Sequence, residues 1–149
     1  MSETKTIAKN RKAYFNYEII SKHEAGIVLR GCEIKSIRAG KASLADSFAR
    51  VDNCEMWLYN LHIDPYTQGN RYNEEPKRTR KLLLKKKEIY KLMGKTEEKG
   101  LALIPLSLYL KNNKAKIELA LGKSKRKFDK RKKIKEREVN REIARGLKN

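Results

Sequence analysis

Aromatic rings and cations alternate in the polar segment from Asp64 to Arg80. The rings are Tyr66 and Tyr72, and the cations are Arg71, Lys77, Arg78 and Arg80. Unpaired bases stack on aromatic side chains while cations contact phosphates, so this mixture suits a surface that binds single-stranded RNA or RNA loops. Composition equally allows both tyrosines to pack against the fold and the charges to be solvated. The segment is therefore a candidate RNA contact.

The densest positive charge lies at the end of the chain. Residues 123–149 contain 13 Lys and Arg against 4 Asp and Glu, in a protein whose net charge is +19. Concentrated charge without packing costs self-repulsion, and phosphates that neutralise it make binding strongly salt-dependent. We predict a polyanion-binding tail that is disordered alone and becomes helical on a charged surface. A solubilising run is an alternative, and a basic membrane-surface helix is disfavoured by the sparse apolar stripe.

Two smaller candidates lie near the N-terminus. Lys9, Asn10, Arg11 and Lys12 form a short basic arm, although a frayed terminus explains the same residues. Glu24 lies at the start of Glu24-Ala25-Gly26, where we expect a turn. A carboxylate can accept hydrogen bonds from bases or from RNA 2′-hydroxyls, but most single carboxylates are only solvated.

Residues that do covalent or metal chemistry are sparse. His23 and His62 are the two histidines, and neither has a metal-ligand spacing. Gly122-Lys123-Ser124 resembles the end of a phosphate loop, but Ile117 stands where that loop requires glycine. Cys32 and Cys54 form neither a disulfide framework nor a zinc motif. We predict a binding protein that is not an enzyme, with no metal and no cofactor.

The elements that position these residues are predicted to be mostly strands. Alternating apolar residues predict a strand that begins at Phe15. Further strands are expected on either side of Asp52-Asn53 and of Asn112-Asn113, where Asn favours the turn of a hairpin. The expected ranges are Ser47–Val51, Met56–Ile63, Leu101–Leu110 and Ala115–Leu121. The chain thus contains about six short strands.

Two segments have helical character. Good helix formers run from Lys81 to Met93, and Gly94 is placed to end that helix. The stretch from Glu24 to Ile37 is ambiguous, because Ile27–Leu29 can form a short helix with Cys32–Arg38 extended after it. We therefore expect one or two helices beside the strands.

A sheet of six antiparallel strands removes its edges by closing on itself. The predicted fold is therefore mainly β, a small antiparallel barrel of the oligonucleotide-binding type with packed helices. We place the barrel in residues 1–122 and the flexible basic tail in residues 123–149. No apolar run approaches the ~20 residues of a membrane span, and the first residues lack a secretion signal. We expect a soluble, cytoplasmic protein.

Short motifs along nearly the whole chain resemble those of the SmpB family, also called small protein B or SsrA-binding protein. Their order and spacing carry the resemblance, since each motif alone is weak. They are Asn10-Arg11-Lys12-Ala13, Glu24-Ala25-Gly26-Ile27, Gly31 to Lys41, Asp46-Ser47-Phe48-Ala49, Pro65-Tyr66, Gly69-Asn70, Arg80 to Leu84, Pro105 to Tyr109, Asp129-Lys130-Arg131 and Lys135-Glu136-Arg137.

The resemblance implies a protein that binds transfer-messenger RNA (tmRNA) in bacterial ribosome rescue. Its barrel would bind the transfer-RNA-like domain, and its tail would occupy the empty decoding centre and messenger channel of the small ribosomal subunit, against ribosomal RNA. Alanyl-tmRNA then enters the stalled ribosome, and the nascent peptide is tagged. The implied partners are tmRNA, the ribosome and the elongation factor that delivers aminoacylated tmRNA, for a monomer.

The resemblance also assigns residues by position. Those implied to hold tmRNA are Asn10, Arg11, Lys12, Glu24 and Leu83. Those implied to enter the decoding site are Lys123, Lys125, Phe128, Asp129, Lys130, Arg131, Lys132, Lys133 and Leu147. A ribosomal or general RNA-packaging protein shares the basic barrel and is the main alternative. A peptide-tagging enzyme is disfavoured because a catalytic constellation is missing from the sequence.

Overall fold

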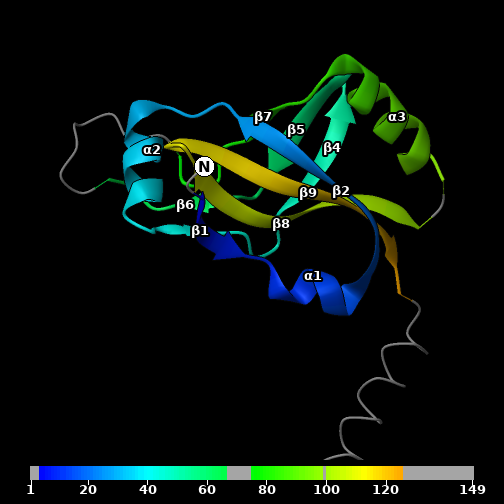
Figure 1. Cartoon of the computed structure of the whole chain (residues 1–149), viewed down its shortest axis with the longest axis horizontal. Coiled ribbons are helices and arrows are strands. Elements are labelled where there is room, and N and C mark those ends of the chain that lie inside the picture. The colour runs from blue at the N-terminus through cyan, green and yellow to red at the C-terminus, as the bar shows by residue number, and fades with distance from the viewer. Residues whose placement is uncertain (1–3, 67–74, 99, 126–149) are drawn as a thin grey trace, which may run out of the picture.

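The computed structural model describes residues 4–66, 75–98 and 100–125, which form antiparallel sheets and three helices (Figure 1). The strands are β1 (Thr4–Lys9), β2 (Tyr17–Ile27), β3 (Ala42–Ser43), β4 (Phe48–Asp52), β5 (Glu55–Tyr59), β6 (His62–Ile63), β7 (Arg80–Leu83), β8 (Leu101–Lys111) and β9 (Lys114–Ser124). The helices are α1 (Arg11–Asn16), α2 (Gly31–Arg38) and α3 (Lys86–Thr96).

Six of the strands form an antiparallel ring. The order is β8-β4-β5-β7-β2-β9, and the long pairing of β9 with β8 returns the sheet to its start. Only the pair Ala49↔Leu103 joins β4 to β8, while β1 pairs with the other end of β8. A small separate sheet pairs β3 with β6. The predicted mainly β, antiparallel barrel with packed helices is confirmed, although the described residues contain more elements than expected.

Two tight hairpins carry the asparagines that the sequence analysis identified. Asn112 and Asn113 have φ values of 51° and 66° between β8 and β9. Two positive φ values in a two-residue loop match the right-handed twist of the strands, and Asn tolerates that backbone well. The β4–β5 hairpin turns at Asn53 and Cys54, one residue later than predicted. Both expected hairpins are confirmed.

Alternate residues of the strands fill the inside of the ring. Leu58, Leu82, Leu108, Ile117 and Leu119 are completely buried there. The two longer helices close the ring at opposite ends (Figure 1), where Ile37 of α2 and Leu92 of α3 join the same core. This core fixes the strand register, and the register decides which side chains point outward.

The third helix, α1, covers part of the outer surface instead. Its Ala13 packs in a second apolar cluster with Ile104, Leu106 and Ala120. These small and medium side chains let α1 lie close against β8 and β9. The N-terminal segment is thereby held beside the end of β9 (Figure 1).

In the ambiguous segment from Glu24 to Ile37, the strand and the helix occur in the reverse of the expected order. Ile27 is the last residue of β2, where it pairs with Leu82, and the helix covers Gly31–Arg38. Glu33 accepts a hydrogen bond of 2.8 Å from the backbone N–H of Arg30, which starts the helix at this point. The expectation of an extended Cys32–Arg38 was wrong because this capping interaction outweighs the local apolar pattern.

The predicted helix from Lys81 to Met93 is in fact a strand and a shorter helix. β7 lies between β2 and β5 and pairs with both, so its backbone groups are satisfied in the sheet. Helix α3 begins at Lys86, and Gly94 lies inside it rather than at its end. Tertiary pairing thus overrides the helix propensity of the Leu and Lys residues.

Both ends of the predicted barrel also differ from expectation. The expected basic arm divides between two elements: Lys9 ends β1, whose partner β8 is about a hundred residues away, while Arg11 and Lys12 lie in α1. The strand expected at Phe15 begins at Tyr17 after α1. At the other end, β9 continues to Ser124, which pairs with Tyr17. Lys123, expected in the tail, therefore lies in the sheet.

Candidate nucleic-acid interface

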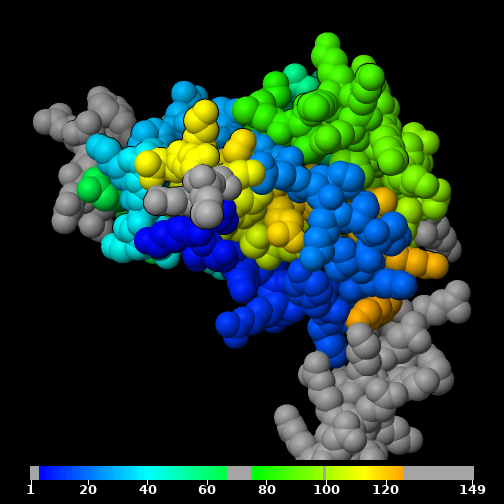
Figure 2. Space-filling view, in the orientation of Figure 1, coloured from blue at the N-terminus to red at the C-terminus, as the bar shows by residue number. Residues whose placement is uncertain are grey.

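Neighbouring strands β7, β2, β9 and β8, with β1 beside them, present one outward surface that we call the outer face. Ala25, Leu108 and Ile117 on these strands point inward and are completely buried, so the alternate residues point outward. Figure 2 shows this side, with β2 and β9 adjacent at its centre. The outer face consists of Lys9, Lys22, Glu24, Gly26, Leu83, Ser107, Tyr109, Lys111, Lys114, Lys116 and Glu118.

The turn expected at Glu24-Ala25-Gly26 was wrong, because these residues pair with β9 inside β2. Glu24 lies in the middle of the outer face and is held by two donors. The Tyr109 hydroxyl donates to its Oε2 at 2.5 Å, and the Lys111 ammonium lies 3.4 Å from the same oxygen. The hydrogen bond from Tyr109 is the main cause that lowers the pKa of Glu24, with a smaller contribution from Lys111. The carboxylate is therefore ionised at neutral pH while its side chain stays 43% exposed.

Leu83 is an exposed apolar residue directly beside Glu24's strand. It pairs with Gly26 of β2, and its side chain is 52% exposed. A side chain at position 26 would meet the Leu83 Cβ at 3.3 Å, so glycine allows this close approach. Leu83 and Gly26 line a groove of about 380 Å³ together with Lys114 and Lys116. An apolar wall and two cations thus adjoin the acceptor Glu24.

Asn10 has a structural role where α1 begins, beside β8. Its backbone N–H donates to the Leu106 carbonyl at 2.8 Å, and its Nδ2 donates to the Pro105 carbonyl at 3.1 Å. These bonds fasten the start of α1 to β8. Arg11, which follows, is exposed and lines a groove of about 420 Å³ that includes Lys22 and Glu118. The structure thus places Arg11 on the same side as Glu24.

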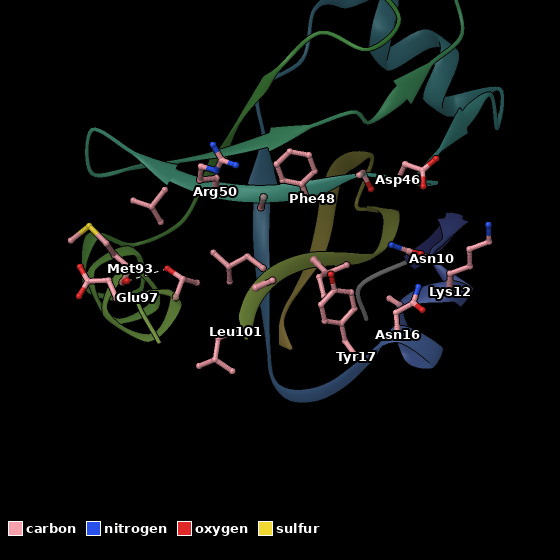
Figure 3. Close-up of a pocket in the computed structure, with 18 residues that line it drawn as sticks. Asn10, Lys12, Asn16, Tyr17, Asp46, Phe48, Arg50, Met93, Glu97 and Leu101 are labelled. Atoms are coloured by element: carbon pink, nitrogen blue, oxygen red, sulfur yellow. Dashed lines mark hydrogen bonds between the residues drawn. The ribbon is translucent and has the colours of Figure 1, made fainter. Parts of the chain in front are cut away.

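Lys12 faces a different cavity, of about 730 Å³, between α1, α3 and β4 (Figure 3). Phe48 and Arg50 of β4 lie along it, opposite an apolar floor that includes Leu101. The Phe48 ring stacks on Tyr59 with centroids 5.1 Å apart, and the Arg50 guanidinium lies 5.8 Å from each ring centroid. This group was not among the predicted candidates, although Phe48 and Arg50 alternate in the strand expected over Ser47–Val51.

The aromatic and basic segment from Asp64 to Arg80 is only partly available for RNA. Arg80 is completely buried, so it is neither an RNA contact nor a solvated charge, the two alternatives that the sequence left open. Tyr66 has the Lys35 ammonium 5.6 Å from its ring centroid, and Lys77 is exposed. Arg71 and Tyr72 lie outside the described residues.

The buried Arg80 belongs to an ion cluster centred on Glu33 of α2. Its Nε donates to Glu33 Oε2 at 2.6 Å, and Arg78 donates to Oε1 at 2.6 Å. Arg80 also donates to the carbonyls of Leu61 and Pro76. Burial acts to raise the pKa of Glu33, but the hydrogen bonds from Arg78, the Arg30 backbone and Arg80 together hold it below its usual value. The cluster joins α2 to Leu61, just before β6, and to Pro76 and Arg78, just before β7.

The tail residues are described only at their beginning. Lys123 is exposed near the end of β9 and pairs with Glu18. The Lys125 backbone N–H donates to the Asn16 carbonyl, and its Nζ donates to the Tyr14 carbonyl, both at 3.0 Å. The other assigned tail residues lie outside the described residues, namely Phe128, Asp129, Lys130, Arg131, Lys132, Lys133 and Leu147.

The described residues hold neither a cluster of metal-ligand side chains nor a helix that could cross a membrane. Between residues 4 and 125, apart from the segments left undescribed, no three His, Cys, Asp or Glu side chains gather as metal ligands would. Within the same part of the chain, the helices are too short or too polar to cross a membrane.

Known proteins match this chain along most of its length. The family model described as "SmpB protein" matches residues 7–149. The "SsrA-binding protein" of Carboxydothermus hydrogenoformans is 60% identical over 144 residues, which cover 97% of both chains. That of Desulforudis audaxviator is also 60% identical, over 97% of this chain and 94% of the relative.

A solved structure agrees at the level of the fold. A chain described under "tmRNA-SmpB: a journey to the center of the bacterial ribosome" superposes with a TM-score of 0.67 at 48% sequence identity. The match covers 80% of this chain and 84% of the other.

Proposed function

Because the chain belongs to the SmpB protein family, we propose that it binds tmRNA through the outer face and serves trans-translation on stalled ribosomes. The observation that carries the proposal is the meeting of Glu24, Leu83 and Arg11 on one side of the barrel, from three separate parts of the sequence. The similar proteins are named for binding SsrA RNA, and the superposed chain comes from a tmRNA–ribosome study.

Each part of the outer face suits a different group of a folded RNA. The ionised Glu24 accepts hydrogen bonds from 2′-hydroxyls or exocyclic amines. The exposed Leu83 offers an apolar contact to a base or sugar, and the flanking Lys114, Lys116 and Arg11 attract phosphates. This arrangement favours a shaped RNA over a single strand, because the sheet register fixes Glu24 and Leu83 and α1 places Arg11 on the same side.

The tail would supply the second half of the function. Residues 126–149 contain 11 Lys and Arg against 4 Asp and Glu, and they follow Lys125, which is fastened to α1. We assign this segment to the decoding centre and messenger channel of the small subunit, where ribosomal RNA is the polyanion. The protein would act as a monomer beside the elongation factor that delivers alanyl-tmRNA, and it would contribute binding rather than a catalytic step.

The test is a paired titration against the transfer-RNA-like domain of tmRNA and an ordinary transfer RNA at several salt concentrations. We expect a preference for the former that survives added salt, because shape recognition does not depend on counterion release alone. The variant Glu24→Ala/Leu83→Ala should lose that preference with its fold intact. Tyr90→Ala is the matched control, since the Tyr90 side chain is as exposed as that of Leu83 but lies on α3.

The same titration distinguishes the proposed function from the main alternative, a general RNA-binding protein. Equal and steeply salt-dependent binding of both RNAs would mean that charge alone acts, and a general RNA-binding protein would then be the better assignment. Retention of the preference by Glu24→Ala/Leu83→Ala would show that another surface reads tmRNA.

A further inference from the structure

The two oxygens of Glu24 are in different situations. Oε2 receives both donors, the Tyr109 hydroxyl and the Lys111 ammonium. Among the described residues, Oε1 accepts no hydrogen bond, and the side chain is 43% exposed. The carboxylate is thus fixed through one oxygen while the other is available as an acceptor.

Tyr109 reaches Glu24 across an intervening strand. Tyr109 lies on β8 opposite Lys116 of β9, while Glu24 lies on β2 opposite Glu118 of the same strand. The hydroxyl therefore passes over β9 to make its 2.5 Å bond. A phenol ring has few rotatable bonds, so this contact restricts the Glu24 side chain more firmly than the flexible Lys111 can.

The phenol is suited to act as a permanent donor. Burial of Tyr109 is the main cause that raises its pKa, and the hydrogen bond and charge of Glu24 raise it further. The hydroxyl therefore keeps its proton throughout the neutral range.

We propose that Tyr109 is a positioning residue for RNA recognition, which holds Glu24 so that Oε1 is the single acceptor for a donor group of the bound RNA. The inference rests on the proposed function, because it requires Glu24 to contact RNA. The donor it fits is a 2′-hydroxyl or an exocyclic amine, since a phosphate oxygen would be repelled by the carboxylate. The adjoining Leu83 and Lys116 then contact the sugar or base and the backbone of the same nucleotide.

A double-mutant cycle on the full chain tests the coupling, with the transfer-RNA-like domain of tmRNA as the probe. We expect Glu24→Ala to weaken binding about tenfold or more, and Tyr109→Phe to weaken it about fivefold, as for loss of a hydrogen bond that orders a charged group. In the Glu24→Ala background, Tyr109→Phe should have no further effect. Tyr90→Phe, on α3, is the matched control and should bind as the unmodified protein does.

Three results would overturn the inference in different ways. If Glu24→Ala binds normally, the proposed interface is wrong and the inference falls with it. If Glu24→Ala weakens binding but Tyr109→Phe does not, the interface stands and Tyr109 has no positioning role. If the two effects multiply in the double variant, Tyr109 acts on RNA independently of Glu24. Thermal melts of all variants identify any that lose affinity through unfolding.

A pH profile supplies a readout that a purely structural role would not move. The groups facing Glu24 are Tyr109 and Lys111 from β8, Lys116 and Glu118 from β9, and Lys22 from its own strand, which pairs with Glu118 at 3.5 Å. Since the Tyr109 bond is the main cause that lowers the pKa of Glu24, Tyr109→Phe should lose RNA affinity at a higher pH as the solution is acidified. The difference between the two profiles should vanish in the Glu24→Ala background. Coincident profiles for Tyr109→Phe and the unmodified protein would refute the positioning role.

Discussion

Glu33 and Arg80 form a buried ion pair in a small barrel, where charges are normally excluded. Their exposed fractions are 3% and 0%, and the carboxylate receives three donors in all. Desolvation of such a pair cancels much of its attraction, so its contribution to overall stability is small. Arg80 also donates to the carbonyls of Leu61 and Pro76, so the cluster ties these two positions to α2.

Removal of one partner should be costly even so. We predict that Arg80→Met lowers the free energy of unfolding by about 3–5 kcal/mol, since it leaves the Glu33 carboxylate buried without its fully buried arginine partner. Urea denaturation followed by circular dichroism measures the change. Lys77→Met is the matched control, because Lys77 is an exposed cation of the same segment. A loss below about 1 kcal/mol would show that water reaches the cluster.

The same cluster predicts a pH dependence of stability. The pKa of Glu33 is lower in the folded protein than its ordinary value, so the folded state favours the ionised carboxylate. This contribution is fully present above the ordinary pKa of a glutamate and is lost as the pH falls towards the folded-state value. We expect Glu33→Gln to be less stable at neutral pH and to show a shallower decline on acidification. Parallel declines for the two proteins would contradict this.

At the residue scale, the sequence offers candidate binding residues but not the groups that they contact in the fold. Glu24 was identified as a possible acceptor, yet its donor Tyr109 is 85 residues away and depends on the strand register. Arg80 was a candidate for an RNA contact or a solvated charge, because its charge is visible in the sequence and its burial against Glu33 is not. Leu83 was found only through the family resemblance, since an apolar residue in a strand carries no signal of exposure.

At the scale of elements, Gly94 was predicted to end a helix that starts at Lys81, whereas the observed helix is α3. It lies inside α3, and a Cβ at this position would meet nothing within 4 Å. We predict that Gly94→Ala raises the free energy of unfolding by about 0.5–1 kcal/mol, because alanine is the better helix former. Thermal or urea denaturation measures this gain. Gly40→Ala is the contrasting variant and should destabilise, because Gly40 has a φ of +77°.

The elements predicted correctly are those specified by local turn chemistry. The Asn112-Asn113 hairpin is one example, since two residues suited to positive φ fix the turn between two apolar strands. The errors lie where distant strands decide the structure. Arg80–Leu83 is a strand because β2 and β5 flank it, and β1 is a strand because β8 does. No local pattern contains those partners.

At the scale of the whole molecule, the positive charge is divided between a rigid sheet and the segment after Lys125. β9 extends to Ser124, and Lys125 is hydrogen-bonded to α1, so a truncation that spares the barrel must begin at residue 126. We predict that this truncation reduces the salt dependence of RNA binding, because 11 Lys and Arg are removed. Its preference for the transfer-RNA-like domain should remain, as measured by the paired titration.

The truncated protein should also fail to support peptide tagging in a reconstituted translation reaction, because the segment assigned to the decoding centre is missing. The matched control is a full-length chain with Glu24→Ala/Leu83→Ala, which should fail at the earlier step of RNA binding. Normal tagging by the truncated protein would contradict the assignment of the tail.

The pairing of the first strands with the last ones has a consequence for biosynthesis. Thr4 pairs with Lys111, and Tyr17 pairs with Ser124, so the strands made earliest wait for the strands made latest. Contacts of such long sequence separation form slowly, and during translation they form only after β8 and β9 have emerged from the ribosome that makes them. A nascent chain that stops before Leu101 lacks the partner of β1 and the main partner of β2. The barrel therefore closes only once the chain has been made through β9, which supplies partners to both β2 and β8.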